Sequence, residues 1–176
     1  MSYDLNLYLK TTPSLSAEAF GKALNSLGWS GELAPDFTMD GSVSPLCAKL
    51  SGILPGDRRT YLAVVDCAVE ENLPAPQVFA LPVPKKSGKK TPPPTLTVPA
   101  GAYRLTFFCG MDHLELPFAL LLCKLLAGED GVLFDPQSAC LAMGESDVQT
   151  LLEKSIADLQ STPTDRLLLH EFDEWI

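Results

Sequence analysis

Hydrophobic and polar residues alternate at the start of the chain with the period of a β-strand. Over residues 3–9 every second side chain is apolar, so one face of this segment would be buried and the other exposed. Helical spacing replaces the alternation after Ser16, which can cap a helix, and the apolar stripe of that helix stops before Gly28. The pattern therefore predicts a strand over 3–9 and a helix over 17–27.

Two further stretches alternate in the same way and predict a pair of strands. Residues 59–69 alternate over their whole length, and residues 96–98 with 103–109 form a second run around a Pro-Ala-Gly turn. We expect these two runs to pair with each other, and residues 77–83 either to extend the first run or to pair with it. Residues 85–95 are rich in lysine, glycine and proline and cannot bury apolar area, which predicts a flexible insert.

A continuously apolar segment in the second half of the chain predicts a buried helix. Pro117 suits the first turn of a helix because its missing N–H would be unpaired there, and residues 118–127 are apolar almost all round. The short apolar run at 132–134 then predicts a buried strand, which ends at Asp135 because Pro136 follows.

The last regular pattern is an amphipathic helix. Ser146 with Gln149 has the spacing of a capping box, and apolar residues recur at helical spacing up to Pro163. Two segments show no sustained period. Residues 29–55 are interpreted as loops with room for one short strand, and the final residues 165–176 leave strand and helix open.

The order of these elements is β-α-β-β-α-β followed by a helix. This order predicts a single α+β domain over residues 1–176, with a ferredoxin-like antiparallel sheet, helices on one face of the sheet and a C-terminal helix. Apolar sheet left in water is unfavourable by about 25 cal/mol per Å². We therefore expect the C-terminal helix, the tail or another protein to cover the opposite face.

Charge narrows the class of partner. The chain has 176 residues, of which 46% are hydrophobic and 20% charged, and its net charge is -9 although four lysines gather at 85–90. An acidic surface repels nucleic-acid phosphate and attracts basic proteins. We therefore expect a basic protein partner and no nucleic acid, while an acidic surface that serves only solubility is the simpler alternative.

The chain shows no signal for export or for membrane insertion. Its start has no basic and apolar leader, and the most apolar stretch, 118–127, is far shorter than the roughly 20 residues that a span needs. The five cysteines are an odd number at wide spacing and sit mostly among apolar residues, where reduced thiols pack like small hydrophobes. These features predict a cytoplasmic protein.

Catalytic and cofactor-binding patterns are weak. Cys109, Asp112, His113 and Glu115 cluster after a predicted strand, but their spacing favours a structural role over a nucleophile with its base. The sequence has only two histidines and no Cys-x-x-Cys, which disfavours a metal site, and it lacks a phosphate-binding glycine loop. We expect no enzyme activity, no cofactor and no metal.

The candidate contact residues are polar or aromatic groups at the ends of predicted elements. Asp135 and Gln137 follow a buried strand, where turn formation and a partner contact remain equally open. The other predicted contacts are Glu115, before the buried helix, and four residues of the tail, which are Glu171, Asp173, Glu174 and Trp175.

Three segments carry a resemblance to a known class of proteins. The opening Met1-Ser2-Tyr3-Asp4-Leu5, the strand Tyr103 to Phe108 before an apolar helix, and the strand end Val132 to Gln137 together resemble small immunity-type proteins of bacterial polymorphic and contact-dependent toxin systems. The resemblance implies a protein that binds a cognate toxin and masks its active site. An acidic surface would suit a basic toxin domain, and the oligomeric state stays open.

A second resemblance rests on one strand. The segment Val98 to Tyr103 is similar to a strand of gyrase-inhibitor-like effector-binding domains, which bind small cationic or aromatic ligands. This resemblance implies a ligand cleft with an acidic residue between sheet and helices. Asp66 and Glu115 are the candidate acidic residues, and Tyr103 is the candidate aromatic contact.

Overall fold

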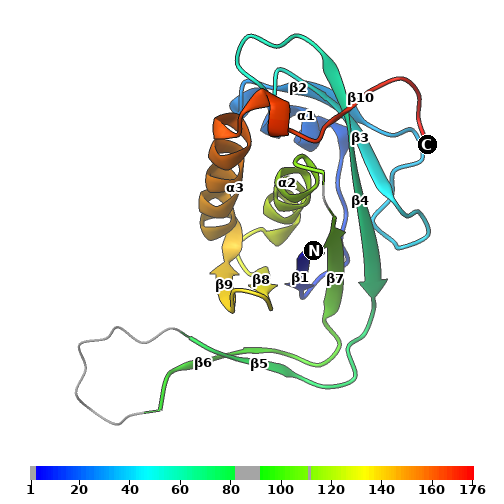
Figure 1. The fold of residues 1–176 in the computed structure, drawn as a ribbon. Coiled ribbons are helices and arrows are strands. Elements are labelled where there is room, and N and C mark those ends of the chain that lie inside the picture. The colour runs from blue at the N-terminus through cyan, green and yellow to red at the C-terminus, as the bar shows by residue number, and fades with distance from the viewer. Residues whose placement is uncertain (1–2, 82–91, 111) are drawn as a thin grey trace.

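Most of the described chain belongs to one antiparallel sheet and three α-helices (Figure 1). The computed structural model describes residues 3–81, 92–110 and 112–176. Its strands are β1 Tyr3–Leu9, β2 Ser30–Leu33, β3 Leu46–Ser51, β4 Thr60–Glu70, β5 Gln77–Ala80, β6 Thr95–Val98, β7 Tyr103–Cys109, β8 Val132–Asp135, β9 Cys140–Met143 and β10 His170–Glu171. Its helices are α1 Ala17–Ser26, α2 Glu115–Ala127 and α3 Gly144–Ser161, with a 3-10 turn at Thr164–Arg166. The predicted α+β class is confirmed.

The order of strands in the main sheet is β2-β3-β4-β7-β1-β8-β9, and β10 pairs with β4. The four predicted strands correspond to β1, β4, β7 and β8, and the predicted pairing of β4 with β7 is confirmed. The ferredoxin-like arrangement as a whole is not matched, because the main sheet has eight strands. The additional strands come from segments whose patterns are short or irregular.

The segment 29–55 is more regular than its sequence indicates. It contains two strands, β2 and β3, which pair with each other, and β3 pairs with β4 from Leu46 opposite Val65 to Ser51 opposite Thr60. The side chains of Leu46, Ala48 and Leu50 are buried. Serines and a glycine in the surrounding sequence hide this alternation, and pairing with β4 decides the conformation.

Residues 95–98 do not continue into β7, contrary to the prediction. They form β6, which pairs with β5 in a separate two-stranded hairpin. A turn separates β6 from β7, where the Gly101 N–H donates to the Leu73 carbonyl and the Leu73 N–H donates to the Ala102 carbonyl. Of the insert predicted at 85–95, residues 85–91 lie outside the described residues, and Thr95 is the first residue of β6.

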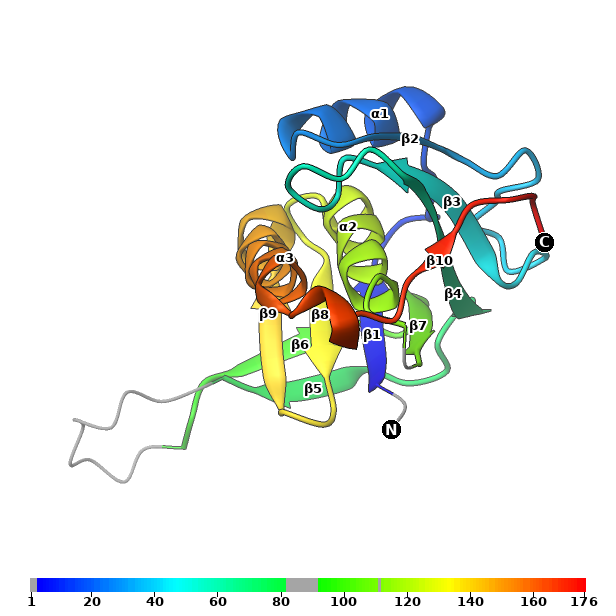
Figure 2. The same cartoon turned by 45° about the horizontal axis from the view of Figure 1, so that its top comes forward.

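The β5–β6 hairpin covers part of the sheet face that lies opposite the helices (Figure 2). The ring of Phe79 of β5 contacts the edge of Tyr8 and, at a tilt, the ring of Phe134, with centroid distances of 5.3 and 5.0 Å. Leu96 of β6 packs against the same small cluster. The sequence predicts that the C-terminal helix, the tail or a partner covers this face of the sheet. The C-terminal helix, α3, instead packs on α2.

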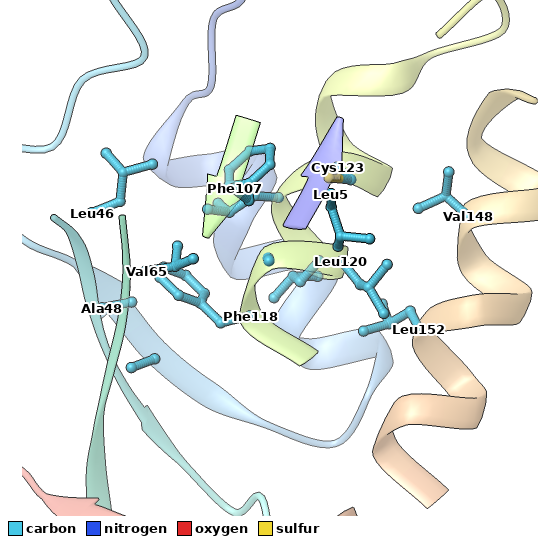
Figure 3. Close-up of a cluster of buried hydrophobic side chains, with 14 of the residues drawn as sticks. Leu5, Leu46, Ala48, Val65, Phe107, Phe118, Leu120, Cys123, Val148 and Leu152 are labelled. Atoms are coloured by element: carbon cyan, nitrogen blue, oxygen red, sulfur yellow. The ribbon is translucent and has the colours of Figure 1, made fainter. Parts of the chain in front are cut away.

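Helix α2 forms the centre of the main hydrophobic core. It contacts β1, β4, β7 and β8 on one side and α3 on the other. Figure 3 shows Phe118, Leu120 and Cys123 of α2 between the side chains of the sheet and those of α3. Because α2 is covered almost all round, its sequence is apolar on every face, as predicted.

The two predicted helix caps have different outcomes. The Ser16 side chain accepts a hydrogen bond from the Ala19 N–H at 3.1 Å, which confirms this cap. The capping box at Ser146 is wrong, because α3 begins two residues earlier, at Gly144. Asp147 bonds the preceding turn instead, accepting from the Met143 N–H at 3.0 Å.

Candidate functional site

A small acidic pocket opens where β4 and β7 meet the start of α2. Its volume is about 290 Å³, close to the lower limit of about 300 Å³ for small-molecule sites. We call it the acidic pocket and define it by its lining residues, Val64, Val65, Asp66, Phe108, Cys109, Gly110 and Glu115. It combines two carboxylates with an aromatic ring.

The strand register places Asp66 beside Phe108. The two residues are direct partners in the antiparallel pair β4–β7, and both are exposed, whereas Val65, Cys67 and Phe107 beside them point into the core. The Phe108 side chain is 41% exposed. On the other side of β7, Asp4 of β1 is the partner of Phe108, so carboxylates flank this ring on both sides.

Asp4 adds an unsatisfied acceptor next to the pocket. Its Oδ1 atom is buried and has no hydrogen-bond partner among the described residues. A buried carboxylate oxygen without a donor is unfavourable, because it has lost water without gaining a replacement. A donor supplied by a bound cation would remove that deficit.

The second carboxylate of the pocket comes from the first turn of α2. Glu115 accepts a short hydrogen bond from the Gly110 N–H, so its side chain turns back towards the end of β7. A Cβ at position 110 would lie 3.0 Å from a Glu115 carboxylate oxygen. Glycine at this position therefore lets the carboxylate approach the backbone.

The negative charges near the pocket also affect the buried thiol of Cys109. Burial is the main cause that raises the pKa of Cys109 to about 12, and the charges of Glu115 and then Asp4 raise it further. A catalytic thiol needs a lowered pKa. Cys109 is therefore a packed side chain whose raised pKa favours the protonated thiol.

Carboxylates beside an exposed aromatic ring recognise cations. Ammonium and guanidinium groups donate charge-assisted hydrogen bonds to carboxylates, and they are also attracted to the face of an aromatic ring. The acidic pocket has room for one such group, and none of its described lining residues is basic. Its chemistry suits the side chain of a lysine or an arginine.

Two of the predicted contact residues, Asp135 and Gln137, lie elsewhere, in the turn between β8 and β9. The Asp135 carboxylate is 5% exposed and accepts bonds from the backbone N–H groups of Gln137, at 2.9 Å, and of Ser138. It also accepts short bonds from the hydroxyl groups of Tyr3 and Ser138. The structure thus shows Asp135 in the turn-forming role, and β1 and β7 separate it from β4.

The predicted contacts of the tail lie in β10 and just after it. Glu171 belongs to β10, pairs opposite Tyr61, and forms an ion pair with Arg59 at 2.8 Å. The Trp175 ring packs on Phe172 and lies under the Lys49 ammonium group. Asp173 and Glu174 are exposed to solvent. Glu171 therefore lies near the start of β4, and the tail runs from Leu62 towards Thr60, away from Asp66.

Asp112 and His113, which also follow β7, contact the C-terminal segment of the chain. The ring Nδ1 atom of His113 accepts a hydrogen bond from the Leu168 N–H at 2.9 Å, and the backbone N–H of His113 donates to the Leu168 carbonyl at 3.0 Å. His170 contacts the Asp112 carboxylate at 3.5 Å, and Asp112 also accepts from the Leu114 N–H. These contacts fix the strand β10, whose conformation the sequence leaves open.

Tyr103 is at the opposite end of β7 and does not line the acidic pocket. Its hydroxyl group shares a hydrogen bond with Thr12 at 3.0 Å. Phe108, which does line the pocket, is the residue that sequence reasoning missed. Its position is nevertheless implied by the alternation of 103–109, which turns every second side chain outward and leaves one outward position aromatic.

The described part of the chain contains neither a candidate metal site nor a candidate membrane-spanning helix. No group of three or more histidine, cysteine, aspartate or glutamate side chains is arranged there to hold a metal ion. None of its helices combines the length and the apolar character required to cross a membrane. Comparisons with protein-family models, with curated proteins and with solved structures give no match.

Proposed function

We propose that this chain is a non-catalytic binding protein whose acidic pocket receives a lysine or arginine side chain of a basic partner. The observation that carries the proposal is that the carboxylates Asp66 and Glu115 and the exposed Phe108 line one pocket. A cationic side chain would neutralise both carboxylates and contact the ring. Most of its affinity would come from charge and shape.

The whole surface supports the same partner. The net charge of -9 attracts basic proteins over a longer range, and such steering accelerates association at low ionic strength. The exposed residues Asp173 and Glu174 of the tail add negative charge to the surface. We expect binding to weaken as salt concentration rises.

The biological role that we propose is that of an immunity protein. The protein would bind a basic toxin domain in the cytoplasm and mask its active site, as the resemblance of the three sequence segments implies. The five cysteines, which form no disulfide, suit a reducing compartment. Co-expression with the polypeptide encoded next to this chain should give a stable complex and protect growth; loss of both effects would remove this role.

The pocket itself can be tested without knowing the toxin. The probe is the blocked peptide acetyl-Ala-Arg-Ala-amide, compared with the same peptide carrying uncharged citrulline in place of arginine. Amide shifts in a two-dimensional NMR titration should change around Asp66, Phe108 and Glu115 with the arginine peptide only. Shifts of equal size with both peptides would contradict recognition of the cation.

A pair of substitutions provides the matched control. Asp66→Asn with Glu115→Gln removes both charges and retains an acceptor for the Gly110 N–H, and it should weaken binding at least about tenfold, because hydrogen bonds to charged groups contribute roughly 1.5–3 kcal/mol. Asp173→Asn with Glu174→Gln removes the same charge from the exposed tail. This control should change the affinity for the short peptide by less than about twofold.

A small cationic ligand is the second candidate. It is favoured by the fact that Asp66 and Glu115, both expected to serve such a ligand, line one pocket. Binding of methylguanidine as tightly as the arginine peptide would favour this alternative. A clear preference for the peptide would favour a protein partner.

A further inference from the structure

A second cleft lies between the sheet and the helices, on the other side of the start of α2. Its volume is about 400 Å³, and it shares no lining residue with the acidic pocket. Its lining residues come from β1, the turn from β8 to β9, α2 and α3, and Figure 1 shows where these elements lie in the fold. We call it the leucine cleft, after its walls of Leu5, Leu116, Leu120 and Leu151.

One hydroxyl group in the lining of the leucine cleft makes no hydrogen bond to the described residues. Ser155 of α3 is only 8% exposed and lines the cleft. Within the described residues its side chain makes no hydrogen bond, not even to the carbonyl one turn earlier in its own helix. The hydroxyl oxygen is not among the fully buried atoms that lack a partner. It is therefore accessible and, because Ser155 lines the cleft, it can bond a ligand there.

The charges around the cleft indicate an uncharged ligand. Lys154 and Asp158 are both exposed at its rim and compensate each other. Asp135 is the buried carboxylate of the lining, and four donors already satisfy it. Burial is also the main cause that raises the pKa of Tyr3 to about 12, so its hydroxyl stays protonated and bonded to Asp135.

We propose that the leucine cleft binds a small, uncharged, mostly apolar molecule that carries one hydrogen-bonding group. The apolar body, of the size of a fused aromatic pair, packs against the four leucines. Its single polar group pairs with the Ser155 hydroxyl. The proposal does not depend on the acidic pocket, because the ligand class and the lining residues are different.

The test uses 2-naphthol, which is uncharged at neutral pH, and its analogue naphthalene, which lacks the hydroxyl group. In an NMR titration of the full chain, 2-naphthol should shift the amides of Leu5, Leu120 and Ser155. Naphthalene should bind at the same place about fivefold more weakly, because a hydrogen bond contributes roughly this factor. Shifts confined to other surfaces, or none at the solubility limit of 2-naphthol, would overturn the proposal.

Ser155→Ala distinguishes a ligand contact from a structural role. The variant should fold at least as stably as the parent, because the hydroxyl makes no hydrogen bond to the described residues and alanine favours a helix. It should nevertheless bind 2-naphthol about fivefold more weakly and naphthalene unchanged. Ser146→Ala, an exposed position on the same helix, should leave both affinities unchanged. Equal binding of 2-naphthol by Ser155→Ala and the parent would contradict the role of the hydroxyl group.

Two charged analogues test the assignment of charge. 2-Naphthoate and 2-naphthylmethylammonium have the same fused rings with a negative and a positive group. Both should bind more weakly than 2-naphthol, because a charge would be desolvated without an unpaired partner. Tighter binding of either ion would overturn the uncharged class of ligand.

Discussion

At the scale of single residues, Asp135 is the side chain whose substitution we expect to affect stability most clearly. Its carboxylate accepts bonds from Tyr3, Ser138 and two backbone N–H groups, and asparagine at this position would lose the charge and present its own donors to them. We expect Asp135→Asn to lower the free energy of unfolding by about 1–3 kcal/mol at pH 7. Urea unfolding measures this difference.

The same bonds make the effect depend on pH. Burial acts to raise the pKa of Asp135, but the hydrogen bonds from Ser138, Tyr3 and the backbone outweigh it and hold the pKa below its ordinary value of 3.8. The stabilisation is therefore present above pH 3.8 and is lost as the pH falls through the lower folded value. The difference between Asp135→Asn and the parent should shrink in that range. Asp158→Asn, at an exposed site, should have little effect at any pH.

Residues differ in how far the sequence determines their roles. The Ser16 cap depends on its immediate neighbours and could be predicted. The exposure of Phe108 follows from alternation, but its partnership with Asp66 and Asp4 depends on pairing between distant strands. Glu115 and Asp66 are predicted as ligand contacts from separate segments of the sequence, and only the fold brings them into one pocket.

At the scale of elements, the two serines at predicted helix starts form a matched pair. Ser16→Ala should lower the free energy of unfolding by about 1 kcal/mol, because the Ala19 N–H loses its acceptor. Ser146→Ala should change it by less than about 0.5 kcal/mol, since that side chain is exposed and lies inside α3. Thermal or urea unfolding of both variants checks the comparison. Equal losses would contradict the start of α3 at Gly144.

Elements with long and regular patterns could be predicted, whereas those that depend on a neighbour could not. The strands β1, β4 and β7 alternate over seven or more residues, and α2 is apolar throughout. By contrast, β2 has only four residues, whose side chains are mostly exposed, and β10 has only two residues. Hydrogen bonds to adjacent strands and the contacts of His113 and Arg59 hold these short strands in place.

At the scale of the whole molecule, two hydrophobic clusters of unequal size lie on the two faces of the sheet. The large cluster surrounds α2, and the small one joins the β5–β6 hairpin to β1, β8 and β9. Local stability follows the amount of buried apolar contact. We therefore expect the hairpin to open independently, at a lower free energy than the rest of the chain.

Two phenylalanine substitutions test this hierarchy. Phe118 is fully buried in the large cluster, so Phe118→Ala should lower the free energy of global unfolding by about 3–5 kcal/mol. Phe79→Ala removes the ring that contacts Tyr8 and Phe134, and it should accelerate amide hydrogen exchange in β5 and β6 while exchange in α2 stays slow. Faster exchange of α2 in Phe79→Ala, to the degree seen in Phe118→Ala, would show that both faces unfold as one unit.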